Sequence, residues 1–301
     1  MPVVKRSAIT MLTISLTFGA LCTFAQKPVP VPQEAKSFKL GALQISVLRD
    51  SALNIPNDGS IFGANTNPPA IAKVLHDTGA PTDEIRLDTD TLLIRMPGHF
   101  VLIDAGYGQA EHGVMRESLA SIGVSLGEIT DILITHAHPD HVGGLVDAQG
   151  RSAFPKVAIR MSAKEWASMQ SQAYLHAQAS AIKAQVQTFE PGRPVLPGIT
   201  PLVLPGHTPG QVGYEIASQG HRLVDIGDIA HSSIISLAKP EWTIKWDSDM
   251  EDGVKTRREE LQRLATTHEL VFVPHFPFPG AGRIERKGEG FSFVPELPSN
   301  K

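Results

Sequence analysis

The chain has 301 residues, of which 42% are hydrophobic and 19% charged, and its formal net charge is −4. These values are typical of a globular protein with one large or two ordinary domains. Basic side chains form no cluster dense enough to neutralise a phosphate backbone, so we expect no nucleic-acid partner. The one cysteine, Cys22, lies near the N-terminus, which argues against disulfides or thiolate metal ligands in the rest of the chain.

The first 25 residues have the pattern of an export signal. Lys5 and Arg6 form a short positive segment, and a mostly apolar run follows over residues 8–20. We therefore predict a signal peptide over residues 1–25, cleaved before Gln26, and a periplasmic or secreted protein without a stable membrane anchor. The alternative is an uncleaved anchor, for which the apolar run is short and rich in threonine, since a membrane span needs about 20 residues.

Loop-forming residues dominate much of the following stretch. Residues 26–37 contain alternating proline and valine and predict an extended tether, after which residues 38–301 are expected to form one domain. Residues 50–88 are rich in proline, asparagine, glycine and aspartate and predict an irregular segment with one short helix over residues 69–76. Such a segment is either a lid over a binding site or a disordered surface loop.

Strands and helices intermix along the rest of the chain. Apolar runs bounded by turn residues predict strands, and helical spacing or many good helix formers predict helices. The predicted strands cover residues 38–49, 91–96, 100–104, 129–134, 157–161, 199–204, 212–217, 222–226 and 270–273, and the helices cover residues 111–122, 163–186 and 250–266. This order predicts an α/β or α+β fold with layered sheets.

A histidine-rich loop follows the fourth of these strands. It contains His136, His138, Asp140 and His141 within six residues. In extended backbone the side chains of His136 and His138 leave on the same side, and Pro139 favours a turn that directs the other two elsewhere. Imidazole and carboxylate suit zinc and its first-row neighbours. One loop can therefore offer two ligands to each of two neighbouring metal ions.

Three later strands also end in a side chain that can bind a metal. His207, Asp228 and His275 each follow a buried strand and a small or rigid residue. Sites at strand ends are held rigidly by the sheet, so we expect these side chains to complete the set begun by the histidine-rich loop. The other histidines are more simply explained as core or surface residues, except where noted below.

This ordered set of ligands resembles that of the metallo-β-lactamase superfamily, over roughly residues 90–295. The resemblance implies an αββα four-layer sandwich with two metal ions at one edge. It implies that the first ion is bound by His136, His138 and His207, the second by Asp140, His141 and His275, and that Asp228 bridges both. Redox members of the superfamily have a glutamate in place of His138, so the chain is expected to be hydrolytic.

Within the superfamily the chain is similar to methyl parathion hydrolases, which are secreted relatives of a lactone-cleaving branch. The segments that carry this similarity are residues 136–145, 153–155, 195–199, 206–210, 247–249 and 278–295. The last segment is the most specific, because the ligand motifs are shared across the superfamily. The similarity also implies a homodimer.

This constellation suits hydrolysis. Two divalent ions roughly 3.5–4 Å apart can share one water, lower its pKa from about 15.7 toward about 7, and polarise a carbonyl or phosphoryl oxygen. We therefore predict a dinuclear hydrolase that uses a metal-bridging hydroxide on lactones, aryl esters or phosphotriesters. Zinc is the expected ion, and manganese, cobalt or iron fit the same ligand types. The alternatives are a β-lactam or thioester hydrolase, or an inactive metal-dependent binding protein.

Three further residues have two interpretations each. Asp140 either carries protons during the reaction or only binds metal. Asp104 either orients a ligating histidine through its second nitrogen or is a turn residue at a strand end. His231 stands where lactone-cleaving relatives often have a tyrosine near the substrate oxygen, so it either donates a hydrogen bond to the developing oxyanion or faces solvent.

The resemblance also implies an aromatic substrate pocket. Tyr107, in the first glycine loop, and Trp166 and Met169, in the predicted helix over residues 163–186, are the candidates. Aryl leaving groups would suit such a pocket. The alternative is that all three are ordinary core residues.

Overall fold

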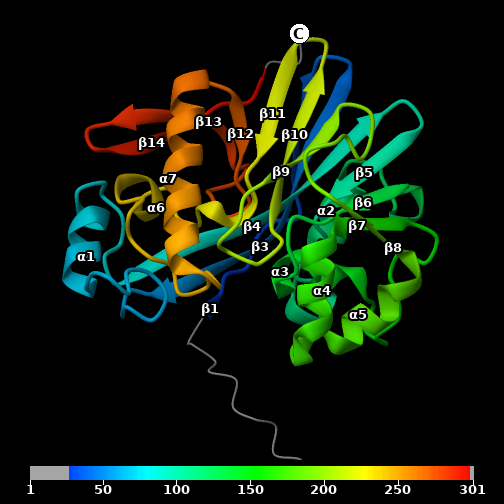
Figure 1. Ribbon diagram of the computed structural model, residues 1–301, viewed down its shortest axis with the longest axis horizontal. Helices are drawn as coiled ribbons and strands as arrows, with labels where there is room; N and C mark the ends of the chain where they lie inside the picture. The colour runs from blue at the N-terminus through cyan, green and yellow to red at the C-terminus, as the bar shows by residue number, and fades with distance from the viewer. Residues whose placement is uncertain (1–26, 299–301) are drawn as a thin grey trace, which may run out of the picture.

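The computed structural model describes residues 27–298, in which the backbone forms two sheets packed face to face with helices on their outer faces (Figure 1). The predicted signal peptide over residues 1–25 lies outside the described residues. No helix between residues 27 and 298 is both long and apolar enough to cross a membrane.

The first sheet is formed by strands that precede residue 190. They are β1 (Lys27–Pro28), β2 (Ala35–Leu40), β3 (Leu43–Pro56), β4 (Glu84–Met96), β5 (His99–Ile103), β6 (Asp131–Leu133), β7 (Ala158–Ser162) and β8 (Val186–Phe189). Among the described residues their order is β1-β3-β4-β5-β6-β7-β8, with β2 paired to β3. Because β5, β6 and β7 are parallel, the loops that follow them leave the sheet at the same edge.

The second sheet is formed by the rest of the chain. Its strands are β9 (Ile199–Val203), β10 (Val212–Ser218), β11 (His221–Asp225), β12 (Leu270–Phe272), β13 (Ala281–Lys287) and β14 (Gly290–Pro295). Their order is β14-β13-β12-β11-β10-β9 in the described part of the chain. Strands β11 and β12 are parallel, so Asp228 and His275, which follow them, emerge at one edge of this sheet.

Helices cover both outer faces (Figure 1). The helices are α1 (Pro68–His76), α2 (Met115–Ser121), α3 (Pro139–Val142), α4 (Ala163–Ser171), α5 (His176–Ile182), α6 (Ile235–Ala238) and α7 (Met250–Thr267). Leu119 of α2, Met169 of α4 and Ile182 of α5 pack on the first sheet, and Leu261 of α7 packs on the second. A further core lies between the sheets. The predicted αββα sandwich is therefore confirmed.

The sequence of β4 shows how a strand that is buried on both faces appears in the amino-acid sequence. Leu92 and Ile94 point into the core between the sheets, whereas Leu93 points into the core under the helices. A strand that is covered on both faces needs a continuous apolar run instead of an alternating pattern. This is why the apolar runs predicted strands correctly.

The segment over residues 50–88 is more regular than predicted. Strand β3 continues to Pro56 and β4 begins at Glu84, and the two pair along this whole stretch, which leaves α1 and short loops between them. Asp88 can lie in the ladder because Arg49 and Arg86 bind its carboxylate. The prediction of an irregular segment was therefore wrong at its two ends, whereas residues 57–67 and 77–83 are irregular and α1 lies where the short helix was expected.

The predicted tether is also part of the first sheet at both of its ends. Residues 27–28 pair with β3, and β2 begins at Ala35. The extended backbone was predicted correctly, but its role as a free spacer was not, because composition does not reveal that the extended segment finds a partner strand.

The long helix predicted over residues 163–186 is wrong. Helix α4 ends before Gln172, which is extended, and α5 begins at His176, while Val186 already belongs to β8. Leu175, between the helices, turns into the core. Helix propensity is a weak prior that tertiary packing overrides.

Two hairpins were not predicted. The single strand predicted over residues 38–49 is the hairpin of β2 and β3, which turns at Gly41 with φ of 58°. The other is the hairpin of β13 and β14, in the segment that carried the similarity to methyl parathion hydrolases.

Candidate metal centre

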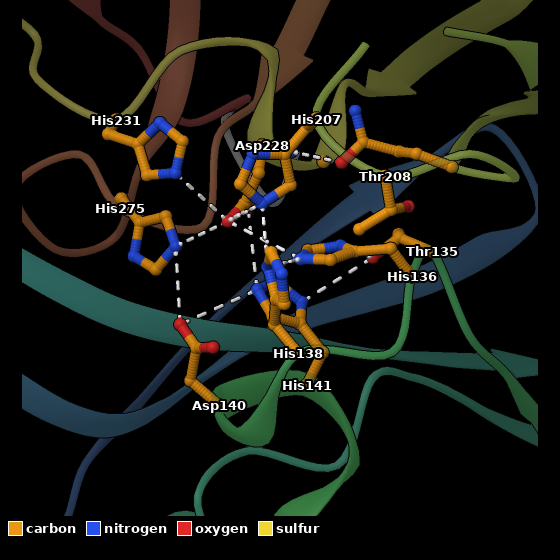
Figure 2. Close-up of polar contacts among 12 residues, drawn as sticks. Thr135, His136, His138, Asp140, His141, His207, Thr208, Asp228, His231 and His275 are labelled. Carbon is orange, nitrogen blue, oxygen red and sulfur yellow. Dashed lines mark hydrogen bonds and ion pairs between the residues drawn. The ribbon is translucent and has the colours of Figure 1, made fainter. Parts of the chain in front are cut away.

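Two loops bring His136, His138 and His207 together. His136 and His138 follow β6, and His207 follows β9, so the ligands come from different sheets. The Nδ1 atom of His138 lies 3.2 Å from Nε2 of His136 and 2.8 Å from Nε2 of His207. Figure 2 shows the rings turned toward one another. We call these residues the three-histidine group, and their ligand atoms lie within 4.8 Å of one another.

A second group combines imidazole and carboxylate. Asp140, His141, Asp228 and His275 have ligand atoms within 4.8 Å of one another. Nε2 of His275 lies 2.9 Å from Oδ2 of Asp228 and 3.4 Å from Oδ2 of Asp140. We call this set the carboxylate group. All side chains predicted as metal ligands thus meet at one edge of the two sheets.

Asp228, a member of the carboxylate group, also faces the three-histidine group. Its Oδ2 is 3.4 Å from Nε2 of His207 and 3.6 Å from Nε2 of His136, and its Oδ1 is 3.4 Å from Nε2 of His141. This is the position of a residue that touches both groups, as the resemblance implied for Asp228. Burial alone would raise the pKa of Asp228, but His275 and the neighbouring imidazoles hold it well below its usual range.

The three-histidine group presents neutral imidazoles. Burial lowers the pKa of His138 and of His207 to about 3, and it holds the pKa of His136 well below the usual value. A neutral imidazole offers a lone pair to a metal ion, whereas a protonated ring cannot. The three rings are therefore in the form that binds a cation.

The residues fit divalent cations. Nε2 of His141 and Oδ1 of Asp228 are buried without a hydrogen-bond partner in the described part of the chain, although they face each other at 3.4 Å. Zinc bonds to nitrogen or oxygen ligands measure about 2.0–2.2 Å, so a shared ion would satisfy both atoms from this separation. Buried polar atoms seldom lack a partner, which makes a cation the simplest explanation of this geometry.

The second nitrogens of the ligating histidines are held by the protein. Oδ2 of Asp104 lies 2.8 Å from Nδ1 of His141, and the same carboxylate accepts from the backbone and hydroxyl of Thr135. The predicted orienting position of Asp104 is therefore found. Such contacts fix the ring orientation of metal-ligating histidines.

Two other orienting contacts were missed by sequence reasoning. Oδ1 of Asp247 lies 3.0 Å from Nδ1 of His207, and the carbonyl of Asp88 lies 2.8 Å from Nδ1 of His275. Asp247 belongs to a segment that carried the resemblance, but nothing in its spacing tied it to His207. The contact of Asp88 involves its backbone, which leaves no signal in the sequence.

His231 is buried beside Asp228, so the expectation that it faces solvent is excluded. The side chain is 1% exposed, and its Nε2 lies 3.3 Å from Oδ2 of Asp228. Its ring stacks on that of His275, with centroids 5.1 Å apart, and also contacts Trp246. His231 therefore belongs to the metal centre, as Figure 2 shows.

The three residues predicted to line a substrate pocket lie in different surroundings. Tyr107 lines a cavity of about 340 Å³ together with Pro139 of the histidine-rich loop, and burial and the carboxylate of Asp140 raise its pKa. Met169 is fully buried in the core between α4 and the first sheet, and Trp166 packs against the same core. The predicted pocket role of Met169 is wrong, because its side chain packs in the apolar core under α4 and does not line the cavity beside Tyr107.

Residues 85–275 match the family model described as the metallo-beta-lactamase superfamily. Curated relatives include ribonuclease Z of Mycobacterium sp. (strain KMS), 31% identical over 77 residues, and ribonuclease Z of Mycolicibacterium gilvum (strain PYR-GCK), 34% identical over 77 residues. In each case the alignment covers 26% of this chain and 25% of the relative. The chain thus spans only about a quarter of the length of these relatives.

Solved structures match over most of the chain. AidC, described as a dizinc quorum-quenching lactonase in complex with the product N-hexanoyl-L-homoserine, has a TM-score of 0.84 and 28% identity over 89% of this chain and 99% of its own. AbOPH, a hydrolase in the beta lactamase superfamily, has a TM-score of 0.81 and 24% identity over 90% of this chain and 100% of its own. At that identity AbOPH supports the fold alone.

Proposed function

The chain belongs to the metallo-β-lactamase superfamily and is a metal-dependent hydrolase of that fold, and we propose that it opens lactones with the help of two divalent cations. The observation that carries the proposal is the carboxylate of Asp228, which lies between two complete groups of ligand atoms. The likeness to AidC supports a lactone as the substrate class.

The two groups have separate ligand sets. We propose that His136, His138 and His207 would hold one ion, that Asp140, His141 and His275 would hold the other, and that Asp228 would touch both. When bound, the pair of ions would lower the pKa of water and withdraw electron density from the ester carbonyl. We propose zinc as the native ion, and manganese, cobalt or iron fit the same ligand types.

The protein's own groups hold charge and orientation around this pair. Asp228 stays ionised because imidazoles surround it, and the neutral rings of the three-histidine group need no proton to leave before they bind a cation. Asp104 fixes the ring orientation of His141, and Asp247 fixes that of His207. A preorganised centre of this kind loses little free energy to rearrangement when charge develops on the substrate.

We propose that Asp140 carries protons. Its side chain is 15% exposed, whereas that of Asp228 is 3% exposed, so Asp140 is the carboxylate that reaches toward solvent and substrate. It would accept a proton from the attacking water and return it to the oxygen released when the ring ester bond breaks. One water and one lactone then give one hydroxy acid.

Two further residues are proposed to contact the substrate. His231 lies against the same carboxylate as the ligands, from which its N–H could donate to the oxygen on which charge develops. Tyr107 lines the cavity next to the histidine-rich loop, which is where an acyl or leaving group would extend from the metal centre.

Phosphotriesters with aryl leaving groups are a second candidate substrate class. They are favoured by the similarity of residues 278–295 to methyl parathion hydrolases. The burial of Met169 weighs against this class, since it removes one wall of the aromatic pocket that the similarity implied.

The test is a metal analysis followed by a substrate panel. Purified protein should hold two ions per chain by elemental analysis and should hydrolyse an N-acyl homoserine lactone faster than a nitrophenyl phosphotriester or a cephalosporin. Protein that holds at most one ion under metal-replete conditions, or that cleaves only the cephalosporin, would overturn the proposal.

We also propose that the protein is exported and forms a homodimer. Export predicts a mature N-terminus at Gln26, detectable by mass spectrometry of protein from the periplasm or the medium. The dimer predicts twice the chain mass by light scattering. An unprocessed N-terminus would contradict the first proposal, and a mass of one chain would contradict the second.

A further inference from the structure

Glu165 joins the two loops that supply the three-histidine group. It lies in the first turn of α4 and is 1% exposed. The backbone N–H of Ala137 donates to Oε1 of Glu165 at 2.7 Å. The hydroxyl of Thr208 and the backbone N–H of Gly210 donate to Oε2 at 2.7 and 3.0 Å. One side chain thus bonds both loops.

The hydrogen bonds of Glu165 involve residues that are next to the ligating histidines in the sequence. Ala137 lies between His136 and His138 in the sequence, and Thr208 directly follows His207. A shift of either donor therefore moves a ligating ring. The two loops leave different sheets, so their separation depends on contacts such as this one.

The start of α4 also forms a hydrogen bond with the carbonyl of Gly210. The hydroxyl of Ser162 caps α4 by accepting from the N–H of Glu165 and donates to the carbonyl of Gly210 at 2.6 Å. A Cβ atom on Gly210 would lie 2.2 Å from the backbone nitrogen of Glu165. Only glycine permits this close approach. Its N–H donates to Glu165 and its carbonyl accepts from Ser162, so both backbone polar groups of Gly210 are bonded at the start of α4.

The carboxylate group is supported by other residues. His141 is oriented by Asp104, and His275 by the carbonyl of Asp88. Glu165 accepts hydrogen bonds from neither ring in the described part of the chain. A change at Glu165 should therefore act on one group of ligands and spare the other.

We propose that Glu165 is a positioning residue that sets the distance of His207 from His136 and His138, and thereby the affinity and geometry of the first cation. It acts through the two loops and not on the substrate. The inference rests on the proposed function, because it assumes that the three-histidine group holds a cation. Metal sites require ligand distances within about 0.2 Å of their preferred values, so a small displacement of one loop matters.

The test is the variant Glu165→Gln. An amide has one acceptor oxygen, so it can serve Ala137 or the pair of Thr208 and Gly210, but not both. We expect one of the two cation equivalents to bind about 10- to 100-fold more weakly, and the other to be unchanged. Stepwise zinc competition against a chromophoric chelator measures both affinities. The visible spectrum of the cobalt-substituted protein reports the coordination geometry independently of turnover.

The matched control is Asp131→Asn. Asp131 is also a buried carboxylate with several partners, His99, Thr130 and Arg160, but it lies at the opposite end of β6 from the histidine-rich loop. Its loss should lower the thermal midpoint and leave both zinc affinities unchanged. Thr208→Val, which removes one donor and keeps the carboxylate, should weaken the same equivalent as Glu165→Gln, by a smaller factor.

The outcomes separate the two proposals. Wild-type protein with at most one ion would overturn the proposed function and this inference with it. Wild-type protein with two ions, whose Glu165→Gln variant keeps both affinities or loses both by the same factor, would overturn the role of Glu165 alone.

Discussion

The carboxylate of Asp228 is surrounded by imidazoles. Among the described residues, the rings of His136, His141, His207, His231 and His275 each place a nitrogen within 3.6 Å of one of its oxygens. Such a density of rings around one buried charge has a cost in desolvation that a pair of bound cations would offset. Asp228 is therefore the residue around which the candidate metal ligands are arranged.

Replacing Asp228 by alanine should abolish binding of at least one ion. Both groups of ligands lose the carboxylate that they share. We therefore expect lactone turnover to fall by more than the roughly 10- to 100-fold that is typical when a residue that only orients a metal ligand is removed. Elemental analysis and initial rates measure the two effects. A variant that retained two ions and full turnover would show that Asp228 is not shared.

Asp247→Ala should weaken zinc binding and turnover by about 10- to 100-fold, since His207 loses the partner of its Nδ1. The matched control is Asp249→Ala, two residues away, which removes the cap of α7. The loss of a helix cap costs about 1 kcal/mol of stability and should leave the zinc affinity unchanged. Equal zinc affinities in the two variants would contradict an orienting role for Asp247.

His231→Ala should lower lactone turnover by about 10- to 100-fold, because Asp228 loses a buried neighbour and the substrate oxygen loses a donor. Steady-state rates on each accepted substrate provide the measurement. Rates equal to those of the wild type on all of them would end the proposed role of His231.

At the scale of elements, loops after buried strands carry the chemistry while helices support them from outside. Strands β6, β11 and β12 each deliver a ligand-bearing loop to the same edge. Helix α4 has two functions along its length: its first turn bonds the ligand loops, and its later residues pack in the core. The similarity to relatives could not distinguish these functions, which is why Met169 was assigned to a pocket.

The core position of Met169 has a direct test. Met169→Ala should lower the free energy of unfolding by about 2–5 kcal/mol because it leaves a cavity under α4. The volume-conserving Met169→Leu should cost less than about 1.5 kcal/mol. Denaturant titration gives both values, and KM for the lactone should be the same in both variants. A raised KM in stable protein would return Met169 to the substrate pocket.

At the scale of the whole molecule, the metal centre joins the two sheets. His136 and His141 come from the first sheet, and His207, Asp228 and His275 from the second. Ions bound between them would stabilise the packing of one sheet on the other, since a ligand that binds only the folded state adds to its stability.

Removal of metal by a chelator should therefore lower the thermal midpoint of the whole domain. A free ion concentration 1,000 times the dissociation constant adds about 4 kcal/mol for one site. Calorimetry before and after chelation measures the change, and added zinc should restore the midpoint. An unchanged midpoint in protein proven to be metal-free would contradict a role of the ions in joining the sheets.

The amino-acid sequence by itself determined the class of the fold and the set of candidate metal ligands that meet in the structure. Buried strands appear as apolar runs, and each loop that carries candidate ligands follows such a run, so both features are local and can be recognised from spacing. The short helix predicted over residues 69–76 is α1, which begins one residue earlier at Pro68 and is capped by Asn67.

Only the tertiary structure decided which side chains support the ligands. Asp247 meets His207 across 40 residues of chain, and Glu165 meets Thr208 across 43. The burial of His231 and Met169 and the pairing of residues 51–56 with β4 also depend on how sheets and helices pack. Spacing along the chain does not encode these contacts, because packing, not sequence distance, brings the groups together.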